Sequence, residues 1–354
     1  MSILHTQKES TVFYHIYNML NRYRRNPRWL DRPTPLACAG GPKGGGNMTE
    51  STAGEDCWPL RSLLFVPGQK PDWIRKAPRA KPDALILDLE DAVPPAEKAA
   101  ARTTVREGIG YCRGIDLPAT VRINHPDEGG LDDIAAVTSH GLVAVLLPKA
   151  RTVEEIRTVD RALCHAEGRA GMRMGTVGIL VLPETAEGMR DAGLLAAAST
   201  RVKGLLGSFG GPVPADMARA FGFRPTYEGA EQYYLASKLV LDSRAAGAPY
   251  PLASLIGTRI DEIEALRKMA VRARDFGFAG CVLIHPSHVA LANEAFTPTA
   301  EEIAYAKGLI AAMAEAEARG AGAVTYRGAM IDYAMLPQAN ATLREARRRG
   351  IAVE

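Results

Sequence analysis

Eight short apolar runs recur along the chain from Trp58 onward, and longer stretches with helical spacing separate them. Several runs are almost continuous in Val, Ile and Leu, which is typical of strands buried on both faces of a parallel sheet. The runs are Ser62–Val66, Ala84–Leu89, Thr120–Ile123, Ala144–Leu147, Gly178–Leu182, Val202–Leu206, Leu252–Ile256 and Cys281–Ile284. The stretches between them include Ala96–Gly108, Thr152–Ala166, Glu187–Ala198, Glu228–Ala246 and Asp261–Phe276.

This alternation predicts an α/β fold in which eight strand–helix units close into a (β/α)₈ TIM barrel, residues 58–298. A doubly wound open sheet is the alternative, but no G-x-G-x-x-G motif follows the first predicted strand. Two further helical stretches, Ala300–Arg319 and Asn340–Arg349, follow the eighth strand. With the intervening Val324–Tyr333 they form a predicted C-terminal helical arm, residues 299–354. We expect the arm to pack on a neighbouring subunit and to bury its apolar pair Met330-Ile331 there.

Residues 1–57 differ in composition from the rest of the chain. They are basic, with only three acidic residues before Ser51, and they contain the low-complexity run Gly40–Gly46. Such a segment has little apolar material from which to build a packed core. We expect a disordered extension, or a true start of the protein at Met48; a transit peptide is the alternative.

Composition and charge exclude several classes of protein. Of the 354 residues, 47% are hydrophobic and 23% are charged, as in globular enzymes. The net charge is only +3 and the basic residues form no long tract, so we expect no nucleic-acid partner. No apolar run reaches the roughly 18–20 residues that cross a bilayer, so we expect no membrane partner. The five cysteines are scattered without a C-x-x-C pair, which favours a reducing, cytoplasmic location over disulfides or a thiolate zinc site.

Polar side chains collect where the predicted strands end. In a barrel the carboxyl ends of all strands meet at one mouth, and active sites lie there. The polar strand ends are Asp88-Leu89-Glu90-Asp91, Arg122-Ile123-Asn124, Pro148-Lys149, Pro183-Glu184, the stretch Gly207–Gly210 leading to Asp216, and His285-Pro286. So many polar ends in register predict a functional site.

The residue types at these ends indicate the chemistry. Carboxylates from different strands suit a hard divalent cation such as Mg²⁺, and no His/Cys cluster competes for a softer metal. A nearby arginine offers a planar fork for a carboxylate, or a charge for a developing enolate. Simpler interpretations stay open: Asp88, Glu90 and Asp91 cap the helix that follows, and His285 is structural. A different catalytic alternative is that Lys149 forms a Schiff base with the substrate.

Several strings resemble the citrate lyase β-subunit-like proteins of the HpcH/HpaI aldolase superfamily, whose close relatives include malyl-CoA and citramalyl-CoA lyases. The resemblance extends over most of the chain after residue 60. Its most specific part is the string D-L-E-D-A-V at 88–93 with a K-x-x-A-R tail at 98–102. The other matching strings are Arg61–Gly68, Val121–Asn124, Leu182–Ala186, Ile284–Pro286 and Met330–Asp332.

The resemblance implies a role for each matching position. Glu184 and Asp216 are the implied metal ligands, for Mg²⁺ or alternatively Mn²⁺. Arg122 is implied to hold the oxo-acid or enolate oxygen, and Arg61 and Glu184 are implied to bind the substrate with it. The substrate is implied to carry CoA as one of its parts.

Further residues are implied to support this site. Glu90 and Asp91 resemble carboxylates that order metal-bound water. Asp332 resembles an acid/base that a neighbouring subunit contributes, and such relatives are commonly homotrimers or hexamers. Two departures bear on the substrate: three extra residues precede Asp216, and no acid follows the seventh strand before Asp261.

The sequence therefore predicts a Mg²⁺-dependent carbon–carbon lyase. It would cleave or form a 3-hydroxyacyl-CoA, of citryl-, malyl- or citramalyl-CoA type, to a 2-oxo acid and an acyl-CoA. One alternative is a metal-dependent aldolase acting on a free hydroxy-oxo acid without CoA. The other is a catalytically idle barrel that binds acyl-CoA, an alternative that a displaced Asp216 would favour.

Overall fold

The structure is a computed structural model that describes residues 57–255 and 260–353. The predicted N-terminal extension, residues 1–57, lies outside the described residues apart from Cys57, and so does the alternative start at Met48. Ile256, the last residue of the seventh predicted strand, is also outside them.

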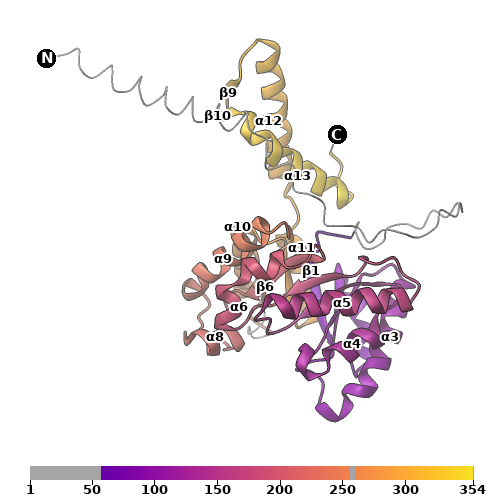
Figure 1. Cartoon of the computed structure of the whole chain (residues 1–354). Helices are drawn as coiled ribbons and strands as arrows, with labels where there is room; N and C mark the ends of the chain where they lie inside the picture. Colours follow the sequence, from indigo (N-terminus) through magenta and orange to yellow (C-terminus); the bar gives the residue numbers. More distant parts are fainter. Residues whose placement is uncertain (1–56, 256–259, 354) are drawn as a thin grey trace, which may run out of the picture. The chain divides into compact units, whose positions relative to one another are not determined.

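Eight parallel strands close into a barrel in chain order, with the first strand hydrogen-bonded to the eighth (Figure 1). This confirms the predicted TIM barrel and each of its eight strands, with small shifts at the strand ends. The strands are β1 (Ser62–Pro67), β2 (Ala84–Asp88), β3 (Ala119–Arg122), β4 (Leu142–Leu147), β5 (Gly178–Val181), β6 (Val202–Ser208), β7 (Leu252–Ser254) and β8 (Gly280–Leu283).

Helices surround the strands, as Figure 1 shows. They are α2 (Pro71–Lys76), α3 (Lys98–Arg113), α4 (Gly130–Val137), α5 (Val153–Arg169), α6 (Ala186–Arg190), α7 (Ala192–Ala197), α8 (Asp216–Phe221), α9 (Tyr233–Ala245), α10 (Ile263–Asp275) and α11 (Val289–Ala295). The single helix predicted over Glu187–Ala198 is wrong in one respect, because it breaks into α6 and α7 at Asp191, whose ψ of 14° leaves the helical range. No described helix is long and apolar enough to cross a membrane.

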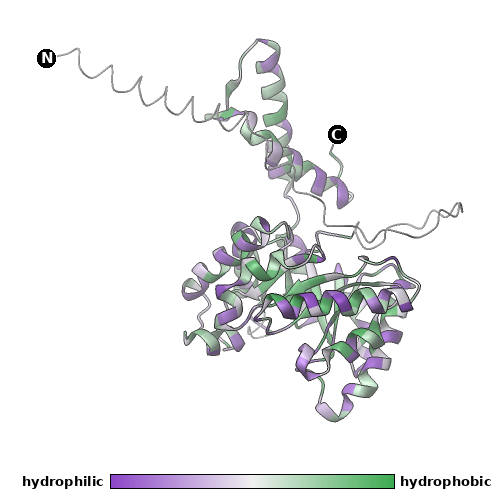
Figure 2. Cartoon of the chain, viewed as in Figure 1, coloured by the Kyte–Doolittle hydropathy of each residue, from purple (hydrophilic) through white to green (hydrophobic). Residues whose placement is uncertain are grey.

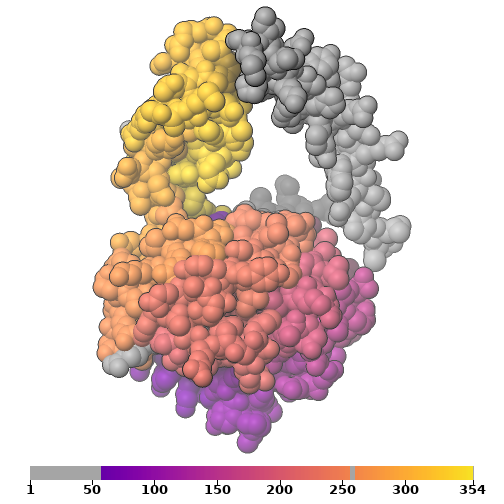
Figure 3. Space-filling view, turned by 90° about the vertical axis from the view of Figure 1, so that its left-hand side faces the viewer, coloured from indigo at the N-terminus to yellow at the C-terminus, as the bar shows by residue number. Residues whose placement is uncertain are grey.

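Alternate residues of each strand face two different cores. In β2, Ile86 belongs to the cluster inside the barrel, whereas Leu85 and Leu87 belong to the larger cluster between strands and helices. Both faces of the strand are therefore buried, which explains the continuous apolar runs of the sequence. The helices show the matching two-sided pattern, green toward the strands and purple outward in Figure 2. Figure 3 shows the surface of the α9–α11 region, in salmon to orange, extending across one face of the molecule.

Local capping fixes where two long helices begin. Thr152 accepts a hydrogen bond from the backbone N–H of Glu155, and the Glu155 side chain accepts one from the N–H of Thr152, so α5 starts with a capping box. Thr299 and Glu302 form the same arrangement ahead of α12 (Ala300–Ala318). These reciprocal bonds satisfy backbone donors that a helix start leaves unpaired.

The C-terminal segment contains a hairpin between two helices. Strands β9 (Ala323–Tyr326) and β10 (Ala329–Asp332) pair antiparallel, and α13 (Leu336–Arg348) follows them. The last helix begins earlier than predicted because Pro337 lies in its first turn, where a missing N–H costs little. Ile331 is fully buried in this segment's own apolar cluster, whereas Met330 is 76% exposed. The expectation that both residues need a neighbouring subunit is thus wrong for Ile331.

Candidate active site

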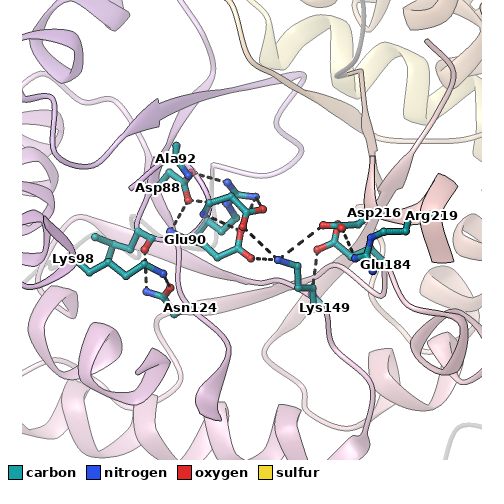
Figure 4. A network of polar contacts seen from close by, with 12 residues as sticks. Asp88, Glu90, Ala92, Lys98, Asn124, Lys149, Glu184, Asp216 and Arg219 are labelled. Carbon is teal, nitrogen blue, oxygen red and sulfur yellow. Dashed lines mark hydrogen bonds and ion pairs between the residues drawn. The ribbon is translucent and has the colours of Figure 1, made fainter. Parts of the chain in front are cut away.

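Asp88 and Arg122 form the first part of the polar mouth. They are the last residues of β2 and β3 and lie opposite each other in the ladder. The guanidinium Nε and Nη2 atoms donate to the two Asp88 oxygens at 2.7 and 2.6 Å. Buried Asp88 also accepts from the backbone N–H groups of Glu90 and Ala92. Asp88 therefore orients Arg122 and shapes the turn after β2, and Figure 4 shows Asp88 beside Glu90 and Ala92 of that turn.

Arg122 is further surrounded by carboxylates and an aromatic ring. Its Nη1 atom lies 3.0 Å from Glu90 and 3.9 Å from Asp91, and its guanidinium carbon lies 4.8 Å from the centre of the Phe65 ring. Burial alone would lower the pKa of Arg122, but the hydrogen bond to Asp88 and the nearby negative charges raise it above its usual value. The site therefore contains a fixed positive charge.

Lys149 connects this group to a second pair of carboxylates. Its Nζ atom lies 2.5 Å from Glu90, 3.4 Å from Asp91 and 3.9 Å from Asp216. Its backbone N–H donates to Glu184 at 3.3 Å. Burial favours the neutral amine, but the bond to Glu90 and the surrounding acids raise the pKa of Lys149 above its usual range. A charged amine cannot attack a carbonyl, so the Schiff-base alternative has no support here.

Glu184 lies among like charges. Burial, together with the negative charges of Asp216 and Glu90, raises the pKa of Glu184 to about 8, although Lys149 and Arg122 act in the opposite direction. A cation between the two carboxylates would relieve this repulsion. The loop with three extra residues leads back to the mouth, because Asp216 starts α8 and its charge reaches Glu184.

The donor set fits a hard divalent cation. In the part of the chain that the structure describes, no group of three or more His, Cys, Asp and Glu side chains could hold a metal. A cation at the mouth would thus rely on Glu184, Asp216, water and substrate oxygens. Mg²⁺ is commonly held in this way, by one or two carboxylates and retained waters.

Arg61 lies elsewhere. It directly precedes β1, so it is at the amino end of the barrel strands, and its guanidinium pairs with Asp83 at 2.7 Å and donates to Thr297. Active sites of such barrels lie at the opposite end. Arg61 fits a structural ion pair, and we do not include it in the substrate site.

The contacts of Asp332 within its own segment are all local, and none of them links it to the mouth. It ends β10, is exposed, and accepts a hydrogen bond from the N–H of Ala334 at 2.9 Å. The geometry within the chain is that of a small turn. Its predicted acid/base role needs a second copy of the chain and remains a prediction.

The K-x-x-A-R tail of the most specific string has a structural role that its sequence did not reveal. The Lys98 ammonium donates to Asn124, and Arg102 pairs with the fully buried Asp133 at 2.7 Å. Asp133 in turn accepts from the backbone and side-chain N–H groups of Asn124. The tail thus fixes the loop after β3, directly beyond Arg122. The sequence analysis also did not predict that Lys149 bridges the acids of the mouth. The only sequence feature that pointed to it was its position at the strand end Pro148-Lys149.

The matches to known proteins agree with this geometry. Residues 61–286 match the family described as HpcH/HpaI aldolase/citrate lyase. The chain is 31% identical to the citrate lyase subunit beta of Haemophilus influenzae, a match that covers 81% of this chain and 97% of that protein. It is 33% identical to an L-malyl-CoA/beta-methylmalyl-CoA lyase of Cereibacter sphaeroides, with 81% and 95% covered.

Solved structures show the same likeness. The protein CitE from Mycobacterium tuberculosis, in complex with magnesium, acetoacetate and coenzyme A, superposes with a TM-score of 0.61 at 28% identity, covering 82% of this chain and 99% of that one. A citrate lyase from Burkholderia xenovorans shares the fold, with a TM-score of 0.71 at 21% identity over 86% and 97% of the two chains. The chain therefore belongs to the HpcH/HpaI aldolase/citrate lyase family and is a lyase.

Proposed function

We propose that the chain is a Mg²⁺-dependent carbon–carbon lyase acting on a 3-hydroxyacyl-CoA, which it cleaves to a 2-oxo acid and an acyl-CoA or forms from them. The meeting of Glu184 and Asp216 with the fixed charge of Arg122 at one barrel mouth carries this proposal. The names of the relatives, and the magnesium and coenzyme A in the M. tuberculosis structure, support the cation and the thioester.

The residues of this chain divide the work. Glu184 and Asp216 would hold Mg²⁺, which when bound acts as a Lewis acid on the carboxylate and carbonyl oxygens of the 2-oxo acid. Arg122, held in place by its forked pairing, stabilises negative charge as the carbon–carbon bond breaks. Glu90 and Asp91 accept hydrogen bonds from water on the cation and keep it oriented.

Asp332 is the proposed acid/base, contributed by a neighbouring copy of the chain in a homotrimer or hexamer. Its exposure in the β9–β10 hairpin supports a contact beyond its own chain, and so does the exposed Met330 beside it. A carboxylate positioned on the reacting group is worth about 10²–10⁴ in rate.

The central experiment is a substrate screen. The purified chain is incubated with a panel of 3-hydroxyacyl-CoA thioesters and the matching free hydroxy-oxo acids, with Mg²⁺ or with EDTA, and the products are identified by mass spectrometry. We expect cleavage of a thioester only with Mg²⁺, loss of that cleavage in Glu184→Gln, and its retention in the exposed control Glu154→Gln. Turnover of a free hydroxy-oxo acid alone would contradict the CoA thioester as substrate, and turnover of a thioester in EDTA would contradict the need for Mg²⁺.

A mixing experiment tests the donated acid. Asp332→Asn and Glu184→Gln are each expected to be inactive, and subunits exchanged between them should recover part of the activity. Recovery follows because some mouths would combine an intact metal site with an intact Asp332. Absence of recovery after exchange is verified by native mass spectrometry would mean that the acid acts within its own chain or not at all.

A further inference from the structure

One lysine connects the two halves of the mouth through both its side chain and its backbone. The Lys149 ammonium faces Glu90 and Asp91 on one side and Asp216 on the other, and Figure 4 shows it between the two groups. The backbone N–H of the same residue reaches Glu184. Four acids of the mouth are thus within reach of one side chain and its own amide, while the fifth, Asp88, pairs with Arg122.

The backbone of Lys149 has an uncommon conformation. Its φ is +52°, in the left-handed region that few residues other than glycine adopt. Such a conformation persists only where the surroundings hold it, and it often marks a functional site. Here it allows the amide to face Glu184 while the side chain extends toward Glu90, so the strained residue is the one that joins both groups.

The remaining positive charges are already engaged. Arg122 donates two hydrogen bonds to Asp88, and its Nη1 atom forms an ion pair with Glu90 at 3.0 Å. Arg219, which is 76% exposed, donates a hydrogen bond to the Oδ1 atom of Asp216. The Oδ2 atom of Asp216 faces Lys149. Lys149 is therefore the cation that a metal ion would have to compete with for that oxygen.

We propose that Lys149 is a positioning residue that acts as an internal counter-charge: it neutralises the carboxylates of the mouth in the metal-free enzyme and competes with the incoming cation for Asp216. The inference rests on the proposed function for the identity of the cation. The ammonium lowers the repulsion among acids before metal arrives, and it releases Asp216 when metal binds while keeping its short contact with Glu90. It thereby limits how tightly the free enzyme holds the metal.

The test compares neutral and charged replacements of Lys149. Lys149→Met and the shorter Lys149→Gln remove the charge, and Lys149→Arg retains it. Lys238→Met is the matched control, since Lys238 is also partly buried and paired with an acid, Asp242, but lies on α9 away from the mouth. Each full-length variant is titrated with MgCl₂ by calorimetry without substrate, and its thermal unfolding is followed in EDTA and in saturating Mg²⁺.

A monovalent and a divalent cation held a few ångströms apart repel enough to change an association constant about tenfold, even with water-like screening. We therefore expect the two neutral variants to bind Mg²⁺ about tenfold more tightly than the wild type, while the Arg variant stays within about threefold. In EDTA the neutral variants should unfold at a lower temperature than Lys238→Met, and Mg²⁺ should raise their midpoint by more than it raises that of the wild type.

Equal or weaker Mg²⁺ binding in both neutral variants would overturn the counter-charge role, and so would EDTA midpoints that match Lys238→Met. Failure of the proposed function has a different signature. In that case Glu184→Gln binds Mg²⁺ as tightly as the wild type, while the unfolding data in EDTA still decide the role of Lys149.

Discussion

Replacing Glu184 by Gln should increase the stability of the metal-free protein while it abolishes Mg²⁺-dependent activity. The carboxyl is partly buried beside Asp216 and Glu90, and this environment raises its pKa from 4.5 to about 8. The unfolded chain ionises Glu184 at its ordinary pKa, whereas the native chain resists ionisation. The folded state therefore loses stability as the pH rises between these two values. A neutral amide of similar shape removes that loss.

The magnitude follows from the shift. One pKa unit corresponds to about 1.4 kcal/mol, so the upper bound at pH 7 is about 3 kcal/mol. Because Glu184 keeps some contact with solvent, we expect about half of this, or about 1–2 kcal/mol. Between the two pKa values the native state binds the extra proton. The gain from Gln is thus near zero at about pH 4.5, grows as the pH rises, and levels off above about pH 8.

Thermal unfolding in EDTA at several pH values measures this effect. Near neutral pH the variant should melt a few degrees above the wild type, since about 1 kcal/mol corresponds to roughly 2 °C in a chain of this length. Saturating Mg²⁺ should stabilise the wild type and leave the variant unchanged. A variant that melts at or below the wild type over the whole pH range would refute the like-charge account of Glu184.

Three further tests address other parts of the molecule. Arg122→Lys loses the forked pairing and should lower kcat/KM about 10²-fold in the thioester assay with little change in melting temperature; a near-normal rate would contradict its role. Glu167→Gln removes one of the two carboxylates that pair with the buried Arg201, the one at 2.7 Å, and should cost about 2 kcal/mol in urea unfolding without changing kcat, because Asp160 still compensates part of the charge. Gly188→Ala puts a Cβ 2.0 Å from a backbone oxygen and should cost about 2 kcal/mol, whereas Gly168→Ala, with open space, should stabilise α5; equal effects would refute the packing argument.

The barrel could be predicted from the sequence because its signal is local. A strand such as β2 is buried on both faces, so the four residues before Asp88 are all apolar and the run is visible without knowledge of its neighbours. The break between α6 and α7 was not visible in the same way. Good helix formers make up most of Glu187–Ala198, although Gly188, Asp191 and Gly193 interrupt them, and only the folded chain shows that the turn falls at Asp191.

The site was predictable only in part. Residue type and strand end identify Glu184 and Arg122, since all carboxyl ends of a barrel meet at one mouth. Position along a matching string was misleading for Arg61, which shares its string with Phe65 but directly precedes β1 and so lies at the amino end of the barrel. The bridging contacts of Lys149 depend on the left-handed backbone at that residue, and no local sequence pattern reveals it.

The pairing of β1 with β8 has a consequence for how the protein is made. Ser62 lies opposite Cys281, so β1, the first barrel strand to be synthesised, has one edge that only β8, the last barrel strand, can cover. Until then the nascent chain exposes an open strand edge, a surface on which chains aggregate. Truncated products that end before β8 keep that edge permanently. Such fragments should be insoluble even when most of the barrel sequence is present, and slow translation ahead of β8 should increase the demand for chaperones.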